Sequence, residues 1–251
     1  MLIRLVAFDL DGTLIRGRKS LAVIGAALRH PEWEKQMEIL YMRGETPEEM
    51  KKRVAPWLEF SADELCCQLV GSHFAPGVDE AFQLLQEQHV TTAIVSISWD
   101  FIVEWFAKRF GTAYWAAVGF NPDGTVTPFW PEDKGPWLEQ LMAKLDVSRH
   151  EVAAVGDSPR DASLFRAAGH SFYVGTERPG RAFRHPALSG REHRSRGASD
   201  PPPLTLVSAS DADQRERPTS RRRLREKGLS ESGVEVLTVG CRRRRAARAR
   251  S

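Results

Sequence analysis

Short apolar runs that end in polar residues recur along the chain, at residues 3–8, 91–95, 152–155 and 171–174. Such runs are typical of buried strands in a parallel sheet. Helical patterns lie between them, at 78–89, 100–110, 136–145 and 159–168. Because strands that alternate with helices usually pair in parallel, the pattern predicts an α/β fold with a Rossmann-like, doubly wound parallel sheet. Segments 116–120 and 125–129 flank an Asn-Pro-Asp-Gly turn, which predicts a small β-hairpin.

Residues 15–76 interrupt this alternation with a pattern that is helical throughout. Thr46 with Glu49, and Ser61 with Glu64, each have the spacing of a helix capping box. An insertion placed directly after the first strand lies above the edge of the sheet where ligands bind in such folds. We therefore predict a small helical cap at 15–76, inserted into a core made of 1–14 and 77–185.

The composition changes abruptly near residue 186. Residues 1–180 hold 18 Lys and Arg against 25 Asp and Glu, whereas residues 181–251 hold 18 against 8. Arg, Ser, Gly and Pro dominate the last segment, which has too few apolar residues to offset its ordering entropy. Segments 204–207 and 234–239 could form short strands, but nothing nearby offers them a partner. Residues 186–251 are predicted to be a disordered basic tail.

Three interpretations of this tail remain open. It could bind nucleic acid or another polyanion through residues 242–250, it could be a solvated tail, or it could be a non-native extension. The solvated tail is favoured, because polybasic tracts bind polyanions weakly when they lack structure.

Length and composition set broad limits. The 251 residues, 41% of them apolar, suffice for one packed domain with an insertion. The longest apolar stretch near the N-terminus, 21–28, is too short to cross a bilayer, and no signal-peptide pattern precedes it. The three cysteines fit no disulfide or metal spacing. These features predict a cytoplasmic protein without membrane contact, and they leave the oligomeric state open.

Two carboxylates follow the first predicted strand, in Asp9-Leu10-Asp11-Gly12-Thr13. Residues i and i+2 of an extended chain point to the same side, so Asp9 and Asp11 converge. Asp and Gly are also common in simple turns, and the pair alone would not decide between a turn and a cation site. Close carboxylates are tolerated where a hard cation or a proton neutralises them.

Polar residues after the later strands favour the second interpretation. Asp157 and Asp161 follow the strand at 152–155 and are spaced to face one pocket. Lys134, just before a predicted helix, offers a compact positive charge. Ser96, with the backbone amides of Ile97 and Ser98 at the expected opening of a helix, forms a cradle suited to an anion.

This order of motifs, over about residues 1–185, resembles the haloacid dehalogenase superfamily, and the segment 43–54 looks most like its phosphoserine-phosphatase-like branch. The resemblance implies a Mg²⁺-dependent phosphomonoester hydrolase acting on a small phosphorylated metabolite. Asp9 would be the nucleophile that becomes an aspartyl phosphate, and Asp11 the proton shuttle. Ser96, Ile97 and Lys134 would bind the phosphoryl group. The metal would be held by Asp9, the carbonyl of Asp11, and Asp157, with support from Asp161.

The second aspartate bears on the reaction type. Dehalogenases of this superfamily characteristically lack an acid at the position of Asp11, because a halide leaves without a proton. Phosphate is therefore favoured over a haloacid. A phosphotransferase or phosphomutase of the same superfamily, which shares both aspartates, remains an alternative, as does a polyanion-binding protein acting through the basic tail.

The sequence also departs from this branch. Where its members carry an acid that reads the substrate ammonium, this chain has Arg16-Gly17-Arg18-Lys19, which disfavours phosphoserine and suits an additional anion. Arg53 matches an arginine of the family's cap, which keeps a substrate carboxylate possible. The usual Ser-Gly-Gly is replaced by Ser96-Ile97-Ser98. Trp57 and Trp99 could line the pocket, but their spacing is more typical of a core.

Overall fold

A computed structural model describes residues 2–35, 47–175 and 207–208. Its main sheet has the strand order β6-β5-β4-β1-β7-β8, with β9 paired to β5. The strands are β1 (Leu5–Phe8), β4 (Thr91–Trp99), β5 (Tyr114–Phe120), β6 (Val126–Thr127), β7 (Val152–Gly156), β8 (His170–Tyr173) and β9 (Val207–Ser208). Five of them, β5, β4, β1, β7 and β8, run parallel. The predicted parallel α/β sheet is confirmed.

The central strand β1 is the most deeply enclosed. All four of its residues, Leu-Val-Ala-Phe, are buried, as expected for a strand covered on both faces. Leu5 pairs with Thr91 on one side and Val152 on the other, so β4 and β7 flank it in register. This register brings the carboxyl ends of the three strands together at one edge of the sheet.

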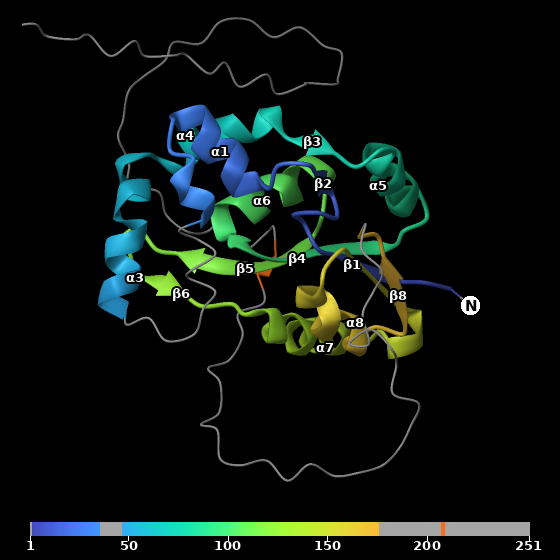
Figure 1. The fold of residues 1–251 in the computed structure, drawn as a ribbon. Coiled ribbons are helices and arrows are strands. Elements are labelled where there is room, and N and C mark those ends of the chain that lie inside the picture. Colours follow the sequence, from blue (N-terminus) through green and yellow to red (C-terminus); the bar gives the residue numbers. More distant parts are fainter. Residues whose placement is uncertain (1, 36–46, 176–206, 209–251) are drawn as a thin grey trace, which may run out of the picture. The chain divides into compact units, whose positions relative to one another are not determined.

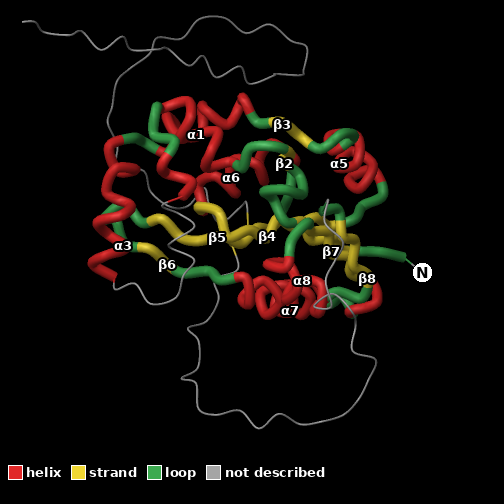
Figure 2. Tube along the Cα trace, in the orientation of Figure 1, coloured by secondary structure: helices red, strands yellow, loops and turns green. Residues whose placement is uncertain are grey.

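Helices cover both faces of the sheet (Figures 1 and 2). On one face lie α5 (Val78–Glu87) and α6 (Asp100–Phe110), and on the other α7 (Lys134–Leu145) and α8 (Ala162–Ala167). Three short 3₁₀ turns flank the last two helices: η3 (Pro131–Asp133) precedes α7, η4 (Arg149–Glu151) lies between α7 and β7, and η5 (Pro159–Asp161) precedes α8. The predicted helices are confirmed apart from small shifts at their ends. No helix within the described ranges has both the length and the apolar content that crossing a bilayer requires.

The insertion is largely helical, as predicted. Its described elements are α1 (Ser20–Leu28), α3 (Pro47–Val54), η1 (Ala55–Glu59), α4 (Ala62–Cys67) and η2 (Gln68–Gly71). The capping box of α4 is confirmed, since the Glu64 amide donates to Ser61 Oγ at 3.2 Å and the Ser61 amide donates to a Glu64 carboxylate oxygen at 2.9 Å. Thr46, proposed to cap with Glu49, lies outside the described residues.

The expectation that residues 15–76 are helical throughout is wrong at both ends. β2 (Ile15–Arg16) pairs antiparallel with β3 (His73–Phe74) in a separate two-stranded sheet. An insertion leaves and re-enters the core at nearly the same place, so its first and last segments run side by side. Pairing satisfies backbone groups that would otherwise lack partners at this crossing.

Aromatic rings join the insertion to the sheet. The ring centroids of Trp33 and Trp57 are 4.1 Å apart, those of Trp57 and Trp99 are 6.4 Å apart, and those of Trp99 and Phe120 are 5.1 Å apart. Trp57 and Trp99 are 1% and 0% exposed. Both tryptophans therefore belong to the core, and the alternative that they line a pocket is wrong.

Two further expectations are corrected along the sheet. Strand β4 does not end at Val95 but continues to Trp99 through an irregularity in its pairing with β5, which lets Trp99 pair with Val118. In the basic tail, Val207 and Ser208 do find a partner, since β9 pairs antiparallel with β5. The predicted disorder and the arginine tract at 242–250 fall outside the described residues.

Candidate active site

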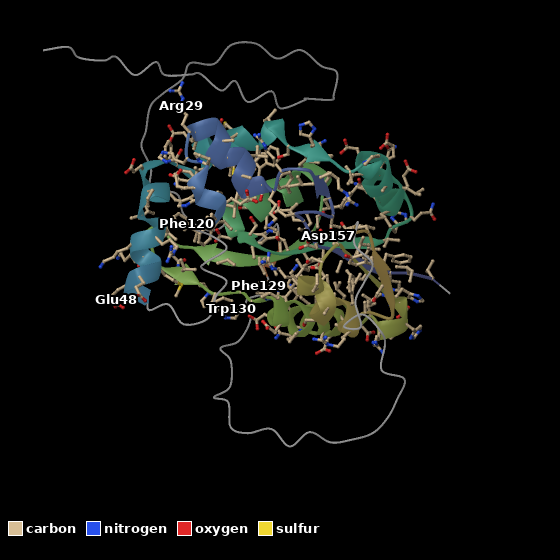
Figure 3. The ribbon with its side chains drawn as sticks, viewed as in Figure 1. Arg29, Glu48, Phe120, Phe129, Trp130 and Asp157 are labelled. Carbon is tan, nitrogen blue, oxygen red and sulfur yellow. The ribbon has the colours of Figure 1, made fainter. Side chains whose placement is uncertain are left out.

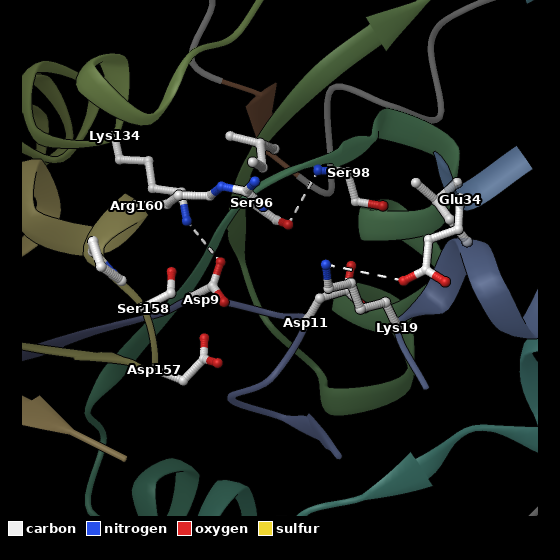
Figure 4. Close-up of a pocket in the computed structure, with 13 residues that line it drawn as sticks. Asp9, Asp11, Lys19, Glu34, Ser96, Ser98, Lys134, Asp157, Ser158 and Arg160 are labelled. Carbon is white, nitrogen blue, oxygen red and sulfur yellow. Dashed lines mark hydrogen bonds and ion pairs between the residues drawn. The ribbon is translucent and has the colours of Figure 1, made fainter. Parts of the chain in front are cut away.

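A cavity of about 350 Å³ opens where β1, β4 and β7 end (Figure 4). Residues from these strand ends and from the helices after them line most of it: Asp9, Asp11, Ser96, Ile97, Ser98, Lys134, Asp157, Ser158, Pro159 and Arg160. The insertion contributes Lys19, Leu21 and Glu34. The predicted cap therefore supplies part of the wall, as a segment inserted after β1 can do.

Asp9 is held by a buried lysine. The ammonium of Lys134 lies 2.7 Å from Asp9 Oδ1 and 2.7 Å from Asp161 Oδ1, and the three residues are 1%, 6% and 0% exposed, respectively. The hydroxyl of Thr13 donates to Asp9 Oδ2 at 3.4 Å. Lys134 is the first residue of α7, two residues earlier than the expected helix start, and one cation thus bridges two carboxylates.

The electrostatics of this cluster follow from burial and charge. Burial raises the pKa of Asp9 to about 7, with Asp161 adding to the rise and Lys134 opposing it. Burial by itself would lower the pKa of Lys134, but the charges of Asp9 and Asp161 and their hydrogen bonds outweigh it and raise that pKa to about 12. Lys134 is therefore a fixed positive charge, whereas Asp9 needs further neutralisation to stay ionised.

Asp161 already has partners on both carboxylate oxygens. Its Oδ1 accepts from Lys134, and its Oδ2 accepts from the amides of Asp157 and Ser158 and from the Ser158 hydroxyl, at 3.1 to 3.2 Å. Ser158 occupies the N-cap position of η5, with Pro159 as the first residue of the turn. Asp161 thus fixes both Lys134 and the loop that presents Asp157.

Asp157 contributes an oxygen without a partner. Its Oδ1 is buried and accepts no hydrogen bond among the described residues. Burial, followed by the charge of Asp161, raises the pKa of Asp157, which Lys134 and Arg16 oppose. One oxygen each from Asp9, Asp157 and Asp161 lie within 4.8 Å of one another. An unpaired buried carboxylate oxygen beside a second carboxylate fits a hard divalent cation.

Gly12 shapes this part of the cavity. Its φ is +95°, and a Cβ atom placed on it would lie 2.1 Å from Asp157 Oδ2. The backbone of the loop after β1 thus approaches the Asp157 carboxylate as only glycine allows. This approach keeps Asp157 next to Asp9, on the side of the cavity where a cation would lie.

Asp11 is separated from this acidic cluster. The Ser20 amide donates to Asp11 Oδ1 at 2.6 Å, and the Ser20 hydroxyl donates to Asp11 Oδ2 at 2.9 Å. Burial raises the pKa of Asp11, and the two bonds from Ser20 partly offset the rise. A raised pKa suits a group that must both give and take a proton.

Ser96, expected to follow a strand, differs from its prediction. Ser96 and Ile97 do line the cavity, but they lie within the strand, and α6 begins only at Asp100. The Ser98 amide donates to Ser96 Oγ at 3.2 Å. The amides of Ile97 and Ser98 therefore do not lie at the opening of a helix, as was expected, because α6 begins at Asp100. The chain stays extended through these residues, so the cradle consists of strand residues.

The remaining basic candidates are spread out. Lys19 lines the cavity, but Arg53 on α3 is not among the residues that line it. Arg16 donates to the carbonyl of Val174 at 3.1 Å. Figure 3 contrasts the exposed Arg29 and Glu48 of the insertion with the half-buried Asp157 of the cavity.

Sequence reasoning missed several residues here. Glu34 lines the cavity 3.9 Å from Lys19, so this wall is not purely basic. Ser20, which holds Asp11, was also missed. Glu34 and Ser20 lie in the insertion, and no motif marked them. A polar residue opening a helix soon after the Asp-x-Asp motif was the one available signal for Ser20.

Comparisons with known proteins agree with this geometry. The family model for haloacid dehalogenase-like hydrolases matches residues 6–166. Among curated proteins no match is found. A solved phosphoserine phosphatase carrying an analogue of the phospho-aspartyl intermediate is 22% identical, with a TM-score of 0.55, covering 69% of this chain and 87% of its own.

Two other solved structures have the same fold. A substrate-bound phosphoserine phosphatase complex is 20% identical, with a TM-score of 0.53, over 68% of this chain and 85% of its own. A HAD family hydrolase from Salmonella enterica serovar Typhi is 18% identical, with a TM-score of 0.56, over 67% of this chain and 62% of its own. Identities this low show the fold alone. Because the family model spans more than half of the sequence, from β1 into α8, the chain belongs to the haloacid dehalogenase-like hydrolase family.

Proposed function

We propose that the protein is a Mg²⁺-dependent phosphomonoester hydrolase that acts on a small phosphorylated metabolite through an aspartyl phosphate on Asp9. One observation supports it above the rest. A buried carboxylate, Asp9, shares a cavity with a fixed cation, Lys134, and with a second carboxylate, Asp11, that is held apart from the acidic cluster. Nucleophile, charge neutralisation and proton shuttle are the parts that phosphoryl transfer requires.

In the first half of the reaction a carboxylate oxygen of Asp9 attacks phosphorus and the bond from phosphorus to the ester oxygen breaks. Asp11 gives its proton to the departing oxygen, which leaves as an alcohol. In the second half Asp11 takes a proton from water, whose oxygen attacks the phosphorus of the aspartyl phosphate. The Asp9 carboxylate is regenerated and inorganic phosphate leaves.

The residues around Asp9 support this proposal. Asp9, Asp157 and the backbone carbonyl of Asp11 would hold the Mg²⁺ ion, and Asp161, whose oxygens already have partners, would support them through Lys134 and the loop at Ser158. When bound, the ion supplies charge neutralisation to Asp9 and to the phosphoryl oxygens. Lys134 and Ser96 would bind those oxygens, with Ile97 beside them. Residues 15–76 would act as the cap that selects the substrate.

The test is a panel of phosphorylated metabolites offered with Mg²⁺ to the wild type, Asp9→Asn and Asp11→Asn, with release of inorganic phosphate as the readout. We expect turnover by the wild type and a loss of at least ~10²-fold in each variant, since each lacks a group that acts in both halves of the reaction. Equal turnover by all three folded proteins would rule out the mechanism. An isomerised sugar phosphate in place of free phosphate would instead identify a phosphomutase.

A further inference from the structure

We propose that Ser20 and Ser98 are positioning residues that fix the orientation of the Asp11 carboxylate toward the leaving group. This inference rests on the proposed function, because it assigns a task to the residues around the proton shuttle. It assigns a role to a serine of the insertion that belongs to no motif, and to the hydroxyl of Ser98, of which only the backbone amide was expected to contribute.

Ser20 donates two hydrogen bonds to Asp11. Its amide lies 2.6 Å from Oδ1 and its hydroxyl 2.9 Å from Oδ2, so one residue engages both carboxylate oxygens. Two bonds from one residue fix the plane of the carboxylate as well as its position. Each oxygen retains a lone pair for a second partner, so Asp11, which lines the cavity, can still serve a substrate.

The start of α1 explains why Ser20 can donate its amide. Ser20 is the first residue of this helix, and amides in a first helical turn have no acceptor within the helix. The side chain of Lys19, at the N-cap position, makes no capping hydrogen bond. Asp11, nine residues earlier in the sequence, takes the place of a capping side chain and thereby ties itself to the insertion.

Ser98 orients the Ser20 hydroxyl. The two hydroxyl oxygens are 3.2 Å apart, and Ser20 and Ser98 are 0% and 2% exposed. Because the single hydrogen of the Ser20 hydroxyl is donated to Asp11, the Ser98 hydroxyl donates in this pair and the Ser20 oxygen accepts. The Ser98 amide donates to Ser96 Oγ, so Ser98 contacts Ser96 through its backbone and Ser20 through its hydroxyl.

Three separate elements meet in this network: the loop after β1, the first turn of α1 and the end of β4. Ser98 can take part because β4 stays extended past Ser96. The replacement of glycine by serine at this point thus has a defined consequence, a hydroxyl aimed at Ser20. A structural role alone would not require that the network end on the proton shuttle.

The leaving group separates a positioning role from a structural one. An alkoxide needs the proton of Asp11 in order to depart, whereas p-nitrophenolate departs without one. A misoriented Asp11 should therefore slow the first half of the reaction for an alkyl phosphate and leave it unchanged for p-nitrophenyl phosphate. Rapid-mixing measurements of the first turnover isolate this half from the later attack by water.

In this assay we expect Ser20→Ala to slow alcohol release from an alkyl phosphate by about tenfold, a part of the ~10²–10⁴-fold that general acid catalysis contributes. The first-turnover release of p-nitrophenol should stay within about twofold of the wild type. Ser98→Ala, which keeps both Ser20 contacts, should show the same selectivity with a smaller effect, and Ser20→Thr should restore the rate.

Thr92→Val is the matched control. Thr92 and Thr112 form a buried hydroxyl pair at 3.4 Å that is not among the cavity-lining residues, and its loss should change neither rate. An equal slowing of both substrates by Ser20→Ala, or no slowing of either, overturns the inference. If Ser20→Ala does not fold, as judged by circular dichroism, Ser98→Ala decides by the same criteria. Asp11→Asn without leaving-group selectivity would contradict the proposed function itself.

Discussion

Nζ of Lys134 lies 2.7 Å from Oδ1 of Asp9, and both side chains are buried. Asp161 shares the same ammonium, so a single positive charge faces two carboxylates. Together these three groups carry a net negative charge that a divalent cation near Asp157 would offset. The ion pair of Lys134 and Asp9 should therefore contribute both to the stability of the metal-free protein and to the negative charge that attracts a cation.

Replacing Lys134 by methionine should cost both stability and activity. The substitution preserves length and apolar contacts but leaves two buried carboxylates without their cation. We expect the free energy of unfolding to fall by about 3–5 kcal/mol, the usual cost of breaking a buried pair from one side. The loss should be smaller in mild acid, because Asp9, whose pKa is raised to about 7, can take up a proton. Urea denaturation at two pH values measures the loss of stability and its dependence on pH.

Lys144→Met is the control for this substitution. Lys144 lies in the last turn of the same helix, is exposed and stacks near the ring of Tyr114. An exposed charge contributes at most about 1 kcal/mol, so the stability should hardly change. Similar losses in the two lysine variants would contradict the special role of the Lys134 ion pair.

Binding of Mg²⁺ should weaken as the pH falls. Burial raises the pKa of Asp9 to about 7, so below that pH a proton competes with the cation for the carboxylate. We expect the affinity to drop by up to about tenfold per pH unit below pH ~7 and to level off above it. Calorimetric titration of the wild type at several pH values measures this, and it does not depend on turnover.

The matched variant for the pH experiment is Asp9→Asn. It should bind Mg²⁺ more weakly at neutral pH and with a shallower pH dependence, because the competing proton on Asp9 is gone. The pKa of Asp157 is also raised, which leaves some pH dependence in the variant. An affinity for the wild type that is constant from mild acid to neutral pH would argue against Asp9 as a ligand.

Much of the site could be predicted because it follows strand ends. Asp9, Ser96 and Asp157 come at or near the end of a parallel strand, and parallel strands place these ends at one edge of the sheet. A local pattern was therefore enough to bring together residues that are far apart in the sequence. Asp161 was expected from the same strand end as Asp157, whereas Lys134 was named from its place just before a predicted helix. In the structure both lie in this cluster.

The rest depended on contacts that local patterns do not encode. Glu34 lines the cavity and Ser20 contacts Asp11 only because the insertion packs on the sheet, through rings such as Trp57 and Trp99. The extension of β4 to Trp99 likewise depends on pairing with a different strand. These features depend on tertiary packing, which leaves no local pattern of apolar and polar residues in the sequence.

Gly12→Ala should disrupt the proposed metal site. A methyl group there would lie 2.1 Å from Asp157 Oδ2, so the carboxylate must move away from Asp9. We expect Mg²⁺ affinity to fall by at least about tenfold, since a displaced ligand no longer completes the coordination. The control is Gly111→Ala, where φ is +63° but no atom lies within 4 Å. That variant should lose about 1–2 kcal/mol of stability from its backbone and bind Mg²⁺ normally. Equal affinities in the two variants would show that Asp157 tolerates displacement.

Lys19 and Glu34, which form one wall of the cavity, should determine which substrate charges are preferred. If an additional substrate anion binds near Lys19, Glu34→Gln removes a repelling charge and should lower the KM for such substrates. Lys19→Met should raise it, each by about two- to fivefold, as expected for half-exposed charges. For a substrate that carries an ammonium group, as phosphoserine does, the signs reverse. Glu32→Gln is the control, because Glu32 is exposed, pairs with His30 and is not among the residues that line the cavity. A higher KM of Glu34→Gln for dianionic substrates would overturn the expectation that this wall receives an anion.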